Sequence, residues 1–272
     1  MNSITVFPNC KINLGLNIVE RRPDGYHNLE TIFYPIPLCD ELTVSAGEKD
    51  ALVVEGIPVD SDPMDNLVMK VVFLLRQEGF DIPPVDVVLK KNIPSGAGLG
   101  GGSSDAAYMM RALNELFELN LSVPQMESYV SRLGADCAFF IQNKPVFATG
   151  IGNVFTPIDL DLEGSTILLV KPDDFISTKE AYSMVEPHKP ILSVNQIIKE
   201  PVSTWKGRMT NDFERSAFPN HPTVQDIRDT LYKSGALYAA MSGSGSSVFG
   251  IFNKVIDIPE SFSSHFTALF QL

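Results

Sequence analysis

Hydrophobic and polar positions recur with two periods along the chain, and these predict its strands and helices. Over residues 12–18, apolar side chains alternate with small or polar ones, which is typical of a half-buried strand. Over residues 66–78, apolar side chains recur at helical spacing, and Gly79 follows as a stop signal. The same patterns predict further strands at residues 29–36, 41–45, 52–54, 85–89, 166–170 and 248–252. They predict further helices at residues 104–117, 122–134, 178–184, 222–234 and 261–269.

The order of these elements predicts an α+β fold. Runs of strands are followed by separate groups of helices in both halves of the chain, which favours α+β architecture over alternating β–α units. The acidic segment DLDLEG, residues 159–164, resembles a surface connection. We therefore predict an N-terminal domain at residues 1–158 and a C-terminal domain at residues 159–272. Residues 186–207 are rich in Pro and Lys and are expected to be irregular.

Charge narrows the classes of function. The chain has 272 residues, a formal net charge of −12 and a pI of about 4.7. A nucleic-acid-binding protein normally presents a basic face, and no cluster of Lys or Arg could supply one. The same acidity disfavours binding to anionic membranes. The acidity does not exclude an anionic ligand, but any phosphate site must be built locally from backbone amides and a few cations.

The cysteines and the N-terminal segment indicate a cytoplasmic location. Cys10, Cys39 and Cys137 are few and widely spaced, which favours neither a disulfide framework nor a zinc cluster. The first residues lack the basic and apolar regions of a secretory signal, and no apolar run is long enough to span a bilayer.

A glycine-rich segment is the strongest local signal. Five glycines fall between Gly96 and Gly102, directly before a predicted helix. Glycine allows consecutive amides to point toward one ligand, and the first N–H groups of a helix add positive potential. The sequence of this segment does not match a Walker A loop, which needs Gly-Lys-Ser/Thr at its end. It also does not match a dinucleotide-binding fingerprint, because no βαβ unit surrounds it. A flexible linker remains the alternative. The predicted cradle consists of Pro94, Ser95, Gly96, Ala97, Gly98, Leu99, Gly100, Gly101, Gly102, Ser103 and Ser104.

With this loop the sequence resembles the GHMP kinase family. Residues 94–106 match the family's phosphate loop, P-x-x-x-G-L-G-[GS]-[GS]-S-S-[DN]-A, throughout. Residues 8–33 and 241–252 resemble two further family motifs in the expected order. The R-x-D-G-Y-H segment within residues 8–33 resembles the branch that acts on CDP-methylerythritol (4-diphosphocytidyl-2-C-methyl-D-erythritol). The resemblance runs from residue 4 to about residue 252.

The resemblance implies a fold and a reaction. The fold would be an N-terminal domain like domain 2 of ribosomal protein S5 and a ferredoxin-like C-terminal domain, with the active site in the cleft between them. ATP, with Mg²⁺ bound through it, would phosphorylate the 2-hydroxyl of CDP-methylerythritol in the non-mevalonate isoprenoid pathway. Two alternatives stay open: another small-molecule kinase of this family, and a nucleotide-binding sensor that has lost catalysis.

Two residues would perform the chemistry. By resemblance, Asp136 is the catalytic base, and its small and apolar neighbours suggest a buried carboxylate with a purpose. Lys11 would keep Asp136 ionised and stabilise the transferring phosphoryl group. The alternatives are a helix-capping or core-paired Asp136 and a strand-end Lys11 that reaches solvent. Ala138 occupies the position two residues after Asp136 where the branch often has Pro. This difference affects the expected backbone shape there, but not the presence of the carboxylate.

Four residues would bind the alcohol substrate. By resemblance, Asn13 lies near Lys11, His27 reads the edge of cytosine, and Tyr26 and Tyr182 flank the base. His27 as an ordinary turn residue and Tyr182 as a core tyrosine are the alternatives. Residues 211–214 resemble a short motif of the branch, for which we expect a structural role.

Overall fold

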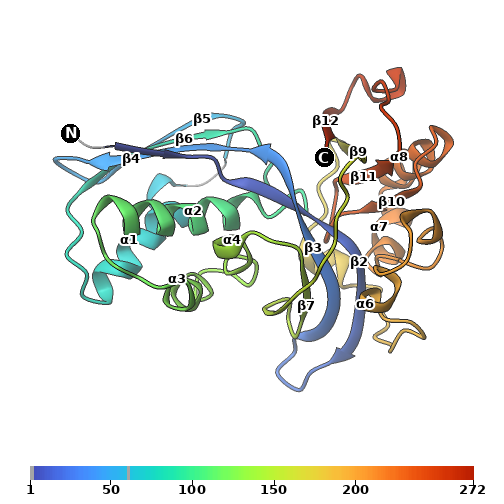
Figure 1. Cartoon of the computed structure of the whole chain (residues 1–272), viewed down its shortest axis with the longest axis horizontal. Coiled ribbons are helices and arrows are strands. Elements are labelled where there is room, and N and C mark those ends of the chain that lie inside the picture. Colours follow the sequence, from blue (N-terminus) through green and yellow to red (C-terminus); the bar gives the residue numbers. More distant parts are fainter. Residues whose placement is uncertain (1–2, 60–61) are drawn as a thin grey trace. The chain divides into compact units, whose positions relative to one another are not determined.

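The computed structural model describes residues 3–59 and 62–272, and the chain groups into two compact units (Figure 1). Unit 1 draws on Met1–Lys11, Pro35–Ser95 and Gly100–Lys144. Unit 2 draws on Ile12–Tyr34, Gly96–Leu99 and Pro145–Leu272. The chain therefore passes between the units more than once, and a domain boundary at residue 158 stays a prediction.

Unit 1 is a four-stranded sheet with helices packed against it. The strand order is β1-β4-β6-β5, in which only the β5–β6 pair is parallel. Helix α2 packs against β1 and β4 and against the neighbouring helices (Figure 1). The strands are β1 (Ser3–Val6), β4 (Glu41–Ala46), β5 (Ala51–Gly56) and β6 (Val85–Lys91). The helices are α1 (Leu67–Gln77), α2 (Gly101–Leu116), α3 (Val123–Val130) and α4 (Phe139–Gln142), with a 3₁₀ helix at Pro63–Asp65.

Capping residues explain where the helices of unit 1 begin. The side chain of Asn66 accepts a hydrogen bond from the N–H of Val68 at the start of α1. At the start of α3, Ser122 and Gln125 form a capping box, so Ser122 is the N-cap that the sequence predicts. Gly79 follows α1 with a positive φ of 91°, as a helix stop requires.

Unit 2 contains a second four-stranded sheet, with α7 and α8 beside it. The strand order is β10-β11-β9-β12, and all pairs are antiparallel. Helix α8 packs against β10, β11 and α7, and its buried Leu231 meets Val248 and Phe252 in the core. The strands are β9 (Thr166–Lys171), β10 (Tyr238–Met241), β11 (Val248–Phe252) and β12 (Phe266–Gln271). The helices are α5 (Thr178–Ala181), α6 (Val194–Ile197), α7 (Glu214–Asn220) and α8 (Pro222–Lys233), with 3₁₀ helices at Val202–Thr204 and Glu260–Phe262.

Two long strands belong partly to each unit. Strands β2 (Asn9–Arg21) and β3 (His27–Cys39) lie in a sheet of order β2-β3-β7-β8, with β7 at Val146–Thr149 and β8 at Val154–Pro157. Every residue of β2 from Asn9 to Ile18 is buried. The prediction of a half-buried strand was therefore wrong, because both faces of β2 are covered and its polar residues lie inside the protein.

The α+β prediction is confirmed, and one predicted helix is wrong. Residues 261–269 do not form a helix: a short 3₁₀ turn leads into β12, which pairs with β9. This pairing supplies hydrogen-bond partners to an edge of the sheet, and Leu269 packs on the core, which the local sequence pattern does not reveal. The helix predicted at residues 178–184 is only the short α5.

Candidate functional site

The glycine loop adopts backbone conformations that favour glycine. Gly96, Gly98 and Gly100 have φ values of 61°, 76° and 71°, in the left-handed region. Helix α2 begins at Gly101, three residues earlier than predicted, so more of the loop belongs to its first turn. The unpaired N–H groups of that turn therefore lie within the predicted cradle, which gives it the positive potential of a helix N-terminus.

Close packing fixes the loop at Gly98. A Cβ atom at Gly98 would lie 1.9 Å from the carbonyl oxygen of Ser242, so this position admits only glycine. The hydroxyl of Ser242 donates a hydrogen bond to the carbonyl of Gly98 (2.9 Å), and the N–H of Ser247 donates to the carbonyl of Ala97 (3.2 Å). The small-residue segment 242–247 therefore lies directly against the glycine loop.

Lys11 and Asp136 form an ion pair beside the start of α2. The Lys11 Nζ lies 3.6 Å from the Asp136 Oδ2, and a Cβ at Gly100 would lie 3.3 Å from the Lys11 Cε. Burial lowers the pKa of Lys11, and the charge of Asp136 opposes that shift. The Asp136 side chain is 30% exposed, so the expectation of a buried carboxylate was wrong, and part of this side chain can be reached from solvent.

Asn13 follows Lys11 by two residues in β2 and is fully enclosed. Its side-chain amide donates to the Thr31 hydroxyl (2.9 Å), and its backbone N–H donates to the Ser242 hydroxyl (3.2 Å). The side-chain carbonyl oxygen of Asn13 would lie 3.3 Å from a Cβ at Gly243. Asn13 is thus held in one orientation next to the segment that supports the glycine loop.

The three predicted aromatic substrate residues fall close together in unit 2. The rings of His27 and Tyr182 stack, with centroids 4.8 Å apart and planes inclined by 22°. Phe213 packs edge-on against Tyr182 from 4.7 Å and steadies that ring. Tyr26, the residue before His27, is 62% exposed. Burial and the nearby Arg21 charge lower the pKa of His27, which favours the neutral ring.

A cavity of about 190 Å³ lies beside the loop in unit 1, and sequence reasoning missed it. It is lined by Val59, Asp65, Asn66, Leu67, Lys91, Ser95, Gly102 and Asp105. Lys91 and Asp105 form an ion pair at its edge (2.7 Å). The alternation along β6 was the available signal, since it places Lys91 on the same buried face as Val85, Val87 and Leu89.

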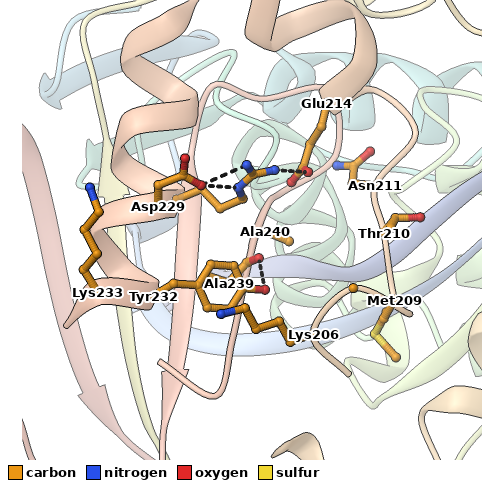
Figure 2. Close-up of a pocket in the computed structure, with 12 residues that line it drawn as sticks. Lys206, Met209, Thr210, Asn211, Glu214, Asp229, Tyr232, Lys233, Ala239 and Ala240 are labelled. Atoms are coloured by element: carbon orange, nitrogen blue, oxygen red, sulfur yellow. Dashed lines mark hydrogen bonds and ion pairs between the residues drawn. The ribbon is translucent and has the colours of Figure 1, made fainter. Parts of the chain in front are cut away.

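A second cavity, of about 430 Å³, contains none of the predicted site residues (Figure 2). The Arg228 guanidinium forms ion pairs with the carboxylates of Glu214 (3.1 Å) and Asp229 (2.9 Å). Figure 2 shows these two carboxylates beside the cavity. Asn211 donates to the carbonyls of Met241 and Gly243 (both 2.8 Å). These contacts agree with the structural role expected for residues 211–214. They hold the end of β10 and the segment 242–247, which lies against the glycine loop.

Among residues 3–59 and 62–272, no group of three or more His, Cys, Asp or Glu side chains is arranged to hold a metal ion. Within the same ranges, no helix has the length and apolar character needed to cross a bilayer.

Comparison with known proteins gives the family. Residues 66–144 match the GHMP kinases N terminal domain, and residues 198–267 match the GHMP kinases C terminal domain. The 4-diphosphocytidyl-2-C-methyl-D-erythritol kinase of Bacteroides fragilis (strain YCH46) is 58% identical over 251 residues, which cover 91% of each chain. The enzyme of the same name from Bacteroides thetaiotaomicron is 54% identical and covers 94% of each chain.

Solved structures agree with this assignment. A crystal structure of 4-(cytidine 5'-diphospho)-2C-methyl-D-erythritol kinase is 32% identical, with a TM-score of 0.77, and the match covers 91% of this chain and 89% of the other. A homoserine kinase from Cytophaga hutchinsonii shares the fold at 15% identity, with a TM-score of 0.67 over 99% of this chain and 94% of its own. The chain therefore belongs to the GHMP kinase family, as a member of its 4-diphosphocytidyl-2-C-methyl-D-erythritol kinase branch.

Proposed function

We propose that the chain transfers the γ-phosphoryl group of ATP to the 2-hydroxyl of CDP-methylerythritol, the alcohol after which its relatives are named. One observation carries the catalytic part of this proposal. The Lys11–Asp136 pair, with 3.6 Å between Nζ and Oδ2, lies next to Gly100, where the glycine loop enters α2. A base and a cation beside a phosphate cradle are the parts that phosphoryl transfer to an alcohol requires.

ATP is expected to bind through the loop of residues 94–104. The left-handed glycines and the first turn of α2 support this, because they gather N–H donors at one place without a lysine. The 190 Å³ cavity is lined by Ser95 and Gly102 of the same loop, which favours it as the place for the nucleoside end of ATP. Mg²⁺ would be held through the ATP phosphates.

In the proposed reaction, Asp136 accepts the proton of the substrate hydroxyl. The hydroxyl oxygen then bonds to the γ-phosphorus, and the bond from that phosphorus to the oxygen bridging to ADP breaks. Lys11 neutralises charge that develops on the attacking oxygen and on the phosphoryl group. The partial exposure of Asp136 supports this role, because a base must be reachable by the substrate, while the buried Lys11 is held in place.

The cytidine end of the substrate is expected at His27 and Tyr182. A neutral histidine ring offers one donor and one acceptor, which suits the edge of cytosine, and its lowered pKa favours that form near neutral pH. A flat base could stack on Tyr182, whose ring already carries the stacked His27, while the exposed Tyr26 would cover it from solvent. Asn13 would contact the substrate near Lys11.

An ADP-release assay tests the proposal. CDP-methylerythritol, homoserine, galactose and mevalonate would be offered separately to the same enzyme preparation with ATP and Mg²⁺. We expect the highest kcat/KM with CDP-methylerythritol. Preference for any of the other alcohols would assign the chain to a different specificity within its family. Tight ATP binding without turnover of any of the four alcohols would favour the alternative of a nucleotide-binding sensor.

A further inference from the structure

Three charged side chains of unit 1, those of Lys91, Asp40 and Asp105, are buried together next to Gly101 of the glycine loop. We call these three residues the Lys91 cluster. Their exposed fractions are 3%, 0% and 1%. The Lys91 Nζ lies 2.7 Å from the Asp105 Oδ2 and also donates to the Asp40 Oδ2. Buried charges are retained only when they are paired and hydrogen-bonded, so this cluster has a fixed geometry.

Asp40 holds the chain immediately before the loop. Its Oδ1 accepts hydrogen bonds from the backbone N–H groups of Asn92 (2.6 Å) and Ile93 (2.8 Å). The Asn92 side chain adds a bond to the carbonyl of Cys39 (3.0 Å). The two residues that lead into Pro94 are therefore tied to the end of β3.

Asp105 holds the chain immediately after the loop, because it is the next residue after Ser104 and lies within α2. Close packing brings the two ends together. A Cβ at Gly101 would lie 2.9 Å from the Ile93 Cγ2 and 3.5 Å from the Lys91 Nζ. Through Lys91, the carboxylate that anchors the entrance of the loop is joined to the carboxylate at its exit.

We infer that Lys91 is a positioning residue for ATP: by joining Asp40 to Asp105 it fixes the separation of the two ends of residues 94–104. This inference rests on the proposed role of the loop as the phosphate cradle. A loop whose ends are held presents its N–H groups in one arrangement before ATP arrives, so less conformational entropy is lost on binding. The cluster should therefore affect ATP affinity and leave affinity for the alcohol unchanged.

The charges of Lys91, Asp40 and Asp105 determine which substitution can test the inference without leaving an unpaired buried charge. Burial and the Asp40 carboxylate raise the pKa of Asp105 to about 7, against the opposing effect of Lys91. Burial lowers the pKa of Lys91, but the two carboxylates outweigh it and leave that pKa raised. Removing Lys91 would leave two buried acids together, whereas neutralising Asp105 leaves a balanced Lys91–Asp40 pair. Asp105 is therefore the position to change.

The experiment compares Asp105→Asn with Asp105→Ala. Both variants remove the same charge, but only the asparagine keeps an oxygen that accepts from the Lys91 Nζ. Isothermal titration with the non-hydrolysable analogue AMPPNP gives Kd, steady-state kinetics give KM for each substrate, and thermal melting reports folding. We expect Asp105→Ala to bind AMPPNP about tenfold more weakly than Asp105→Asn. KM for CDP-methylerythritol should stay within about twofold in both.

Equal AMPPNP affinity of the two variants would overturn the inference. Equal increases in both KM values, or an Asp105→Ala protein that does not fold, would assign the cluster to general stability and also overturn it. The proposed function fails separately, since AMPPNP binding can be measured even if CDP-methylerythritol is not turned over. Asp81→Ala, at an exposed carboxylate outside the cluster, is the control and should change neither constant.

Discussion

The ring of His27 stacks on the ring of Tyr182, with a centroid separation of 4.8 Å. These two residues lie far apart in the sequence, one at the start of β3 and the other directly after α5. Phe213, a residue of the unit 2 core, packs edge-on against Tyr182 and supports the stacked pair. This arrangement makes the proposed cytidine site testable without changing the residues proposed for phosphoryl transfer.

Replacing Tyr182 should weaken alcohol binding selectively. Tyr182→Ala removes the stacking surface, and an aromatic pair contributes about 1 kcal/mol, so KM for CDP-methylerythritol should rise about fivefold. Tyr182→Phe keeps the ring and should stay close to wild type. KM for ATP should not change in either variant. An unchanged KM for the alcohol in Tyr182→Ala would remove this residue from the site.

Replacing Asp136 should abolish most turnover and preserve ATP binding. Asp136→Asn keeps the shape of the side chain but cannot accept the hydroxyl proton, so kcat should fall by about 10²–10⁴-fold. AMPPNP affinity, measured by titration calorimetry, should stay near the wild-type value. Asp81→Asn, at an exposed carboxylate, is the matched control. A kcat within about threefold of wild type would show that Asp136 is not the base.

Gly98 offers a test of the close contact between the glycine loop and Ser242. Gly98→Ala places a Cβ 1.9 Å from a carbonyl oxygen at a φ of 76°, so the loop must move. Gly164 is the control, because its φ is 78° and a Cβ there would have no heavy atom of the described residues within 4 Å. Gly164→Ala should cost about 1 kcal/mol of stability from backbone strain alone and leave activity intact.

Gly98→Ala should therefore lose more than its control in both measurements. We expect a free energy of unfolding lower by a further ~1–3 kcal/mol, from denaturant titration, because overpacking is added to the strain. KM for ATP should rise at least about tenfold, since the displaced carbonyl and amide groups belong to the cradle. Equal behaviour of the two variants would mean that the Ser242 contact does not shape the loop.

His221 should make stability depend on pH. Its Nδ1 lies 3.0 Å from Asp174 and its Nε2 lies 3.0 Å from Glu180, so only the doubly protonated ring can donate to both carboxylates. Burial lowers the pKa of His221, but the two carboxylates outweigh it and the pKa is raised. The folded protein thus binds this proton more tightly than the unfolded chain, and the stabilisation is complete below the unfolded pKa, near 6.5.

That stabilisation is lost as the pH rises through the folded pKa of His221. The melting temperature of His221→Gln should therefore fall furthest below that of the wild type at about pH 5.5, and the gap should narrow toward about pH 9. Differential scanning calorimetry at several pH values measures this gap. A gap that widens with pH would contradict the protonated bridge.

The sequence predicted the parts of the fold and site that depend on local signals. The N-cap at Ser122 follows from residue types a few positions apart, and the glycine loop from its own composition. The proximity of Lys11 and Asp136, 125 positions apart, came only from the family resemblance, since no periodicity relates them. The partial exposure of Asp136 was missed because apolar sequence neighbours do not determine which side of a turn faces solvent.

Other features depend on pairing across the chain. Residues 266–271 contain enough apolar side chains to suggest a helix, and only the free edge of β9 selects a strand. Lys91 is the last residue of β6 and precedes a loop, where a lysine usually reaches solvent, yet it pairs with the buried Asp40 and Asp105. Such contacts need partners that are distant in sequence, so a single sequence without its structure does not reveal them.

The burial of residues 9–18 of β2 limits which mutations the strand can accept. Because residues 9–18 have no solvent face, a change at Lys11 or Asn13 must satisfy the packing of the interior as well as the chemistry, and few substitutions can do both. Tyr26 is under no such constraint, since most of its side chain is exposed. Altered substrate preference is therefore more accessible by mutation at Tyr26, in the proposed cytidine site, than along β2, which carries the proposed catalytic Lys11.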